Sequence, residues 1–117
     1  MLSWKELEEY AEQEVDRLLV SLPDELREPA SSVVVFLKEK DEVEDGLLGL
    51  FEGADFSEEI RGHPDALPRI TLFLGTICEA TGGTESAYRE EVRVTFLHEL
   101  GHYFGWDEDE IAMRGLG

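Results

Sequence analysis

The sequence predicts an α+β fold: an N-terminal helix, a small mixed β-sheet and a long helix near the C-terminus that carries a metal site. Three observations indicate this fold. Apolar residues recur at helical spacing after Ser3. Runs rich in apolar and β-branched residues at 32–37 and 69–77 are typical of strands. Residues 85–97 lack Gly and Pro, which favours a helix, and lead directly into the pattern H-E-x-x-H at 98–102.

The first helix has a recognisable beginning and end. Ser3 and Glu6 form a capping box, in which each side chain satisfies a backbone N–H of the other residue. The helix is expected to end just before Pro23. A short second helix follows, and it should stop before Pro29 because a proline disfavours helical geometry in the preceding residue.

The middle of the chain predicts strands and loops. Residues 32–37 are expected to form a buried strand, and 38–45 a charged loop. A short strand at 47–51 lies between two glycine-containing turns. Residues 54–67, with Pro64 inside the segment and Pro68 directly after it, predict a loop, whereas 69–77 predict another strand.

The most informative pattern is His98-Glu99-Leu100-Gly101-His102. Residues four apart on a helix share a face, with Cβ atoms about 5–6 Å apart. Two imidazoles at this spacing can bind one zinc ion. Glu99 lies further round the helix, where its carboxylate can act as general base towards a water molecule activated by the zinc.

A third ligand is expected just beyond this helix. Gly105 can end the helix in the left-handed conformation, which reverses the chain. Asp107, Glu108 and Asp109 then follow, and spacing favours Glu108, ten residues after the first histidine, with Asp109 second. Alternatively, Asp107 and Glu110 form a capping box for another short helix; both interpretations can hold together.

These patterns resemble the minimal zincins of bacteria, small predicted zinc metallopeptidases with the pattern H-E-x-x-H-x-x-G-x-x-D. The resemblance covers most of the chain. It includes the acidic first helix running into residues 22–26, the segment 47–53, which is similar to an LLGLYEG segment of that family, and the strand at 69–74.

The resemblance implies that His98 and His102 are zinc ligands and that Glu99 is catalytic. Glu108 stands where the family usually has Asp, so the identity of the third ligand stays open among the three acids. In zincins an edge strand can bind an extended peptide by strand addition. Residues 47–51 or 69–77 would offer that edge here.

The function expected from these residues is zinc-dependent hydrolysis of peptide bonds. Two other classes remain open. One is a non-catalytic module that binds metal or docks a partner. The other is a zinc endoribonuclease of the bacterial rRNA-maturation type, which uses H-x-x-x-H-x-x-G-x-x-H; the acidic surface and the position of Glu99 count against it.

Composition limits the partners. The 117 residues suffice for a single domain, 1–117, and 42% are hydrophobic, enough to bury a core. The net charge of −18 repels nucleic acid and favours cationic peptides or proteins. No segment has the length of a membrane span, and no signal peptide is recognised. A cytoplasmic monomer or homodimer is therefore expected.

Two further residues have side chains that can bind a metal ion. The single Cys78 cannot form an internal disulfide, and it follows an apolar run, so a small core residue is expected rather than a ligand. His63 lies in a loop beside Pro64, where a histidine is more often exposed than functional.

Overall fold

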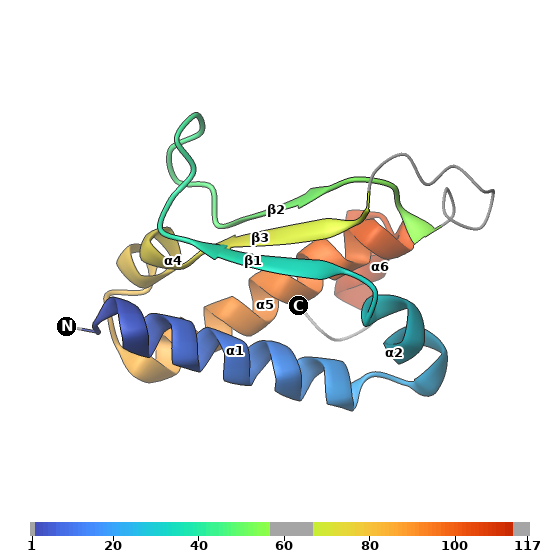
Figure 1. Ribbon diagram of the computed structural model, residues 1–117, viewed down its shortest axis with the longest axis horizontal. Helices are drawn as coiled ribbons and strands as arrows, with labels where there is room; N and C mark the ends of the chain where they lie inside the picture. Colours follow the sequence, from blue (N-terminus) through green and yellow to red (C-terminus); the bar gives the residue numbers. More distant parts are fainter. Residues whose placement is uncertain (1, 57–66, 114–117) are drawn as a thin grey trace.

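The computed structural model describes residues 2–56 and 67–113, and it confirms the predicted α+β fold (Figure 1). Its three strands form one layer, and the two long helices run along one face of that layer. In chain order the elements are α1 (Trp4–Ser21), α2 (Asp24–Ala30), β1 (Val34–Lys38), β2 (Gly49–Glu52), β3 (Arg69–Phe73), α4 (Leu74–Ala80), α5 (Glu85–Phe104) and α6 (Glu108–Met113). That these elements make up a single domain over 1–117 stays a prediction.

The sheet has the strand order β1-β3-β2. β1 is parallel to β3, with Val34 opposite Arg69, and β2 is antiparallel to β3, with Gly49 opposite Leu72. β3 is therefore the central strand, and its residues from Ile70 to Phe73 are all buried. An apolar run without alternation is what a strand covered on both faces requires.

The strand predicted at 32–37 is present, but it runs from 34 to 38. The prediction that it is buried was wrong. β1 is an edge strand whose exposure alternates, with Val34 41% and Phe36 44% exposed. Val35 and Leu37 are partly buried and pack against the core. A β-branched run shows that a strand is favoured, but it does not show whether both faces are covered.

The strand predicted at 69–77 ends at Phe73, and α4 begins at Leu74. The neighbouring strand explains this correction, because β1 pairs with β3 only as far as Lys38 opposite Phe73. Beyond that pair the backbone N–H of Thr76 bonds to the carbonyl of Glu39 at 3.2 Å. β3 therefore ends where its pairing with β1 ends. The apolar run at 69–77 does not contain this information, because it depends on the neighbouring strand.

The predicted beginning of the first helix is confirmed. The N–H of Ser3 donates to Glu6 Oε1 at 2.9 Å, and the N–H of Glu6 donates to Ser3 Oγ at 3.2 Å. The second helix, in contrast, continues through Pro29, so the predicted stop was wrong. Pro29 lies in the last turn, where a missing N–H removes a single bond, and the N–H of Ser31 still bonds to the carbonyl of Arg27 at 3.0 Å.

α5 is the central element of the core, packed against α1 on one side and against β2 and β3 on the other. Two tyrosines of α5 are fully buried, and each hydroxyl has a backbone acceptor. Tyr88 donates to the carbonyl of Leu7 at 2.8 Å, and Tyr103 donates to the carbonyl of Pro29 at 3.4 Å. These bonds join α5 to the N-terminal part of the chain and hold the helix that carries the two histidines.

A buried carboxylate also joins α1 to α5. Glu14 is only 5% exposed, and its Oε2 accepts from Arg89 at 2.9 Å and from Arg17 at 3.1 Å. Arg89 also donates to Gln13 at 2.8 Å and lies 4.3 Å from the centre of the Tyr10 ring. Arg89 thus satisfies the buried charge and packs against the surface of α1.

Replacing Arg89 with Ala should lower the free energy of unfolding by about 2 kcal/mol, because Glu14 loses a charged hydrogen-bond donor where water is mostly excluded. The matched control is Arg17→Ala, since Arg17 contacts the same oxygen but is 69% exposed. Exposed ion pairs contribute little, so the control should lose less than about 0.5 kcal/mol. Urea unfolding measures both values, and equal losses would contradict the assignment of Arg89 as the principal partner.

Among the helices of residues 2–56 and 67–113, none is long and apolar enough to cross a bilayer. The cytoplasmic location stays a prediction.

Candidate metal centre

The two histidines of the motif lie one above the other near the end of α5. Their ring centroids are 4.8 Å apart, with the ring planes at 79°. Together with Glu99 they form a compact group: one possible ligand atom from each residue lies within 4.8 Å of the others. Both histidine side chains are partly exposed, so the group lies at the surface rather than inside the core.

The helix ends as the sequence predicted. Gly105 has φ +81°, the left-handed conformation that side chains disfavour. The N–H of Gly105 bonds to the carbonyl of His102 at 3.0 Å, and the N–H of Trp106 bonds to that of Gly101 at 2.9 Å. This pair of bonds is a Schellman motif, which ends a helix and reverses the chain. The residues after Gly105 therefore return towards the histidines.

This reversal brings Glu108 to both imidazoles. Its Oε1 lies 3.3 Å from Nε2 of His98 and 3.7 Å from Nε2 of His102. Two nitrogen donors and one carboxylate oxygen at such separations suit zinc, because ligands about 2.0–2.2 Å from a tetrahedral ion lie roughly 3.3 Å from each other. The donor set thus fits the metal that the motif suggests.

The two neighbouring acids are placed differently. Asp107 accepts a hydrogen bond from the backbone N–H of Glu110 at 2.8 Å, as the capping interpretation predicts. Asp109 is exposed on α6, and across residues 2–56 and 67–113 it forms no ion pair with either histidine. The structure thus brings Glu108, and not Asp107 or Asp109, into contact with the two rings.

The contact between α5 and α6 depends on a glycine whose importance the sequence analysis missed. A Cβ on Gly101 would lie 2.6 Å from both Cγ1 and Cδ1 of Ile111, which is 5% exposed. Ile111 can pack this closely against α5 only because residue 101 has no side chain. Because Ile111 follows Glu108 by three residues on the same short helix, this contact positions the Glu108 carboxylate. The available signal was a glycine inside a segment predicted to be helical.

Glu99 points towards strand β2. Burial raises the pKa of its carboxyl group, while the two histidines and a hydrogen bond from the backbone of Phe51 oppose that shift. The close approach of β2 depends on Gly49, where a Cβ would lie 2.7 Å from Thr95 Cγ2 and 3.3 Å from Glu99 Cγ. Glu99 is therefore enclosed between α5 and the strand.

β2 is the edge strand beside the motif (Figure 1). Of the two edges that the sequence suggested, residues 47–51 correspond to this strand. The other, 69–77, was wrong, because β3 is bonded to a strand on each side and has no edge to offer.

Two cavities open on opposite sides of Glu99. One, of about 430 Å³, is lined by Leu50, Phe51, Asp55, Glu99 and His102. The other, of about 350 Å³, is lined by residues 46–49 of the chain before and within β2, and by Glu91, Val94, Thr95, His98 and Glu99 of α5. The two cavities share Glu99, and they follow the edge of β2.

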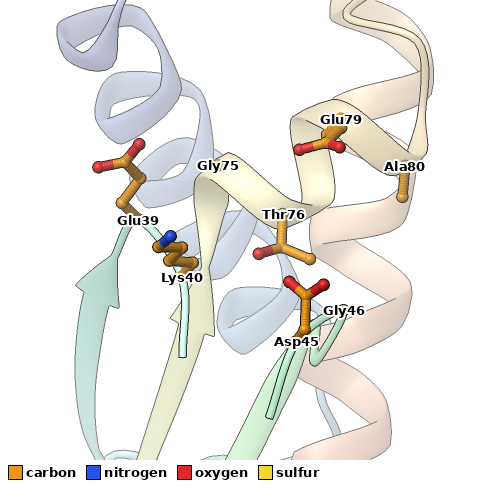
Figure 2. Close-up of a pocket in the computed structure, with 8 residues that line it drawn as sticks. All are labelled: Glu39, Lys40, Asp45, Gly46, Gly75, Thr76, Glu79 and Ala80. Carbon is orange, nitrogen blue, oxygen red and sulfur yellow. The ribbon is translucent and has the colours of Figure 1, made fainter. Parts of the chain in front are cut away.

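A further cavity, of about 460 Å³, lies beside α4 (Figure 2). Glu39 and Lys40 directly follow β1, Asp45 lies in the loop before β2, and Thr76 and Glu79 lie on α4. Neither His98 nor His102 lines it, although Gly46 lines both this cavity and the one beside His98.

Of the two remaining candidates, the structure describes only Cys78, and this residue does not join the histidines. Cys78 lies on α4, partly buried and packed against the core, as expected of a small core residue. His63 lies outside the described residues.

A helix with two histidines and an intervening glutamate, set beneath the edge of a small mixed sheet, forms a candidate metal site of the H-E-x-x-H type. The profile of the zincin-like metallopeptidases matches residues 27–116. The chain therefore belongs to the zincin-like metallopeptidase family, as its motifs predicted. No curated protein matches the sequence. Membership of this family implies zinc as the metal and a protein or peptide as the substrate.

Proposed function

We propose that this protein is a zinc endopeptidase in which His98, His102 and Glu108 hold one zinc ion and Glu99 is the general base. The observation that supports it best is the convergence of Glu108 Oε1 on Nε2 of both histidines, with Glu99 beside them. Three protein donors leave a fourth position open, the arrangement typical of catalytic rather than structural zinc.

Each residue has a definite task in this proposal. When bound, zinc supplies Lewis acidity, which polarises the substrate carbonyl and lowers the pKa of water. Glu99 accepts the proton of the attacking water and delivers it to the leaving amine. Because burial raises the pKa of its carboxyl group, Glu99 is a stronger base than an exposed glutamate.

We propose that the substrate binds along the outer edge of β2. Its inner side is bonded to β3, and in the described part of the chain no strand pairs with its outer side. An extended peptide can add there as a further strand, with main-chain hydrogen bonds supplying affinity. Such a peptide would run along the two cavities and present a bond to Glu99.

The test is cleavage of a mixed peptide library by zinc-loaded protein, read by mass spectrometry. We expect cleavage with zinc, loss of cleavage after chelation, and its return when zinc is restored. A zinc content of one ion per chain should accompany activity. Bound zinc without any cleavage would instead support the non-catalytic metal-binding module, and cleavage that persists in the chelated protein would contradict the zinc mechanism.

A further inference from the structure

The cavity on the Gly49 side of Glu99 has apolar walls. Leu47 and Leu48 lie on the strand side, and Val94 on the helix side. It adjoins His98 and Glu99, so a side chain next to the bond presented to Glu99 would enter it.

A carboxylate closes the far end of this cavity. Glu91 is seven residues before His98, so it lies on the same face of α5, about 10 Å away along the helix axis. Its Oε2 accepts a hydrogen bond from the hydroxyl of Thr95 at 3.3 Å. In the part of the chain that the structure describes, Glu91 forms no ion pair, whereas its neighbour Glu90 is paired with Arg93 at 2.6 Å. Glu91 thus presents an uncompensated negative charge at the end of an apolar passage.

We propose that this cavity selects lysine or arginine in the substrate and that Glu91 is the residue that determines this specificity; the proposal rests on the proposed peptidase function. Long basic side chains bury their methylene stems along apolar surface and keep the charged end at a polar partner. Leu47, Leu48 and Val94 supply the apolar surface, and Glu91 supplies the partner. An acidic substrate side chain is repelled there, and the net charge of −18 attracts cationic peptides to the whole molecule.

The experiment uses peptides that differ at a single position next to the cleaved bond. That position carries Lys, Arg, norleucine or Glu. Norleucine matches the lysine stem without its charge. We expect kcat/KM to be about 10-fold higher for Lys and Arg than for norleucine, the scale of a single specific contact in a pocket. Glu91→Gln should remove the preference, and Glu91→Lys should shift it towards Glu.

The matched control is Glu90→Gln, the same change of charge one residue away, at a position that does not line the cavity. It should keep the preference for Lys and Arg. Cleavage with equal kcat/KM for Lys and norleucine, or a preference that Glu91→Gln leaves intact, would overturn the specificity proposal while the peptidase function stands.

A binding measurement separates this proposal from the peptidase proposal. If zinc-loaded protein cleaves none of the peptides, the proposed activity fails, and the Lys and norleucine peptides are then made as hydroxamates and titrated calorimetrically. Tighter binding of the Lys peptide that is lost in Glu91→Gln supports the pocket. Equal binding of the two peptides overturns it.

Discussion

Glu99→Gln is expected to keep its bound zinc and to lose about 10²- to 10⁴-fold in kcat for peptide cleavage, the range that general acid–base catalysis contributes. Gln has nearly the shape of Glu but cannot accept the proton from water at neutral pH. The enclosed position between α5 and Gly49 should be preserved, because the substitution adds no volume. We therefore expect the zinc content to stay the same while kcat falls. A variant that failed to fold would lose both.

The measurement pairs metal analysis with initial rates on one cleaved peptide. Glu9→Gln on the exposed side of α1 provides the same change of charge far from the motif and should leave kcat unchanged. If Glu99→Gln cleaves at the rate of the unaltered protein, Glu99 is not the base. If it loses zinc as well, Glu99 contributes to metal binding.

The second large effect is expected at the third ligand. Glu108→Ala should raise the dissociation constant for zinc by about 100-fold or more. Structural zinc sites with four donors bind with about 10–16 kcal/mol, or roughly 3 kcal/mol per donor, and 1.4 kcal/mol is tenfold in affinity. We expect this loss of zinc affinity for Glu108 and not for its neighbours, because Glu108 Oε1 lies close to Nε2 of both histidines.

Asp109→Ala is the matched control, since Asp109 is an exposed acid on the same helix. Competition with a zinc chelator gives both dissociation constants. Asp109→Ala should bind zinc as the unaltered protein does. A larger loss in Asp109→Ala than in Glu108→Ala would mean that α6 turns differently when zinc binds, and the assignment of Glu108 would have to be given up.

Several features were predictable because they depend on residues close in the chain. Helix periodicity places His98 and His102 on one face, whatever the helix packs against. The capping box at Ser3 and the left-handed Gly105 are likewise local, and both are confirmed. The H-E-x-x-H part of the family motif could be recognised for the same reason, because it is a short run on one helix.

The errors in the predicted strands have a common cause in contacts between distant segments. The apolar run after Arg69 could not reveal that β1 ends opposite Phe73, so the switch to α4 was missed. The sequence does not reveal the order of the strands either. For that reason 69–77 was predicted as a possible edge strand for a peptide, although β3 is the central strand. An apolar run has no period of its own by which strand and helix can be distinguished.

The amino-acid sequence alone determined which helix bears the metal motif, where that helix ends, and that an acid follows within reach. Tertiary structure decided which acid contacts the histidines, through the seating of Ile111 on Gly101, and which strand borders Glu99, through the approach of β2 at Gly49. It also brought Glu91 to the end of a cavity. The physical reason is that side-chain direction within a helix follows from its period, whereas close approach between elements depends on packing across segments that the chain order does not relate.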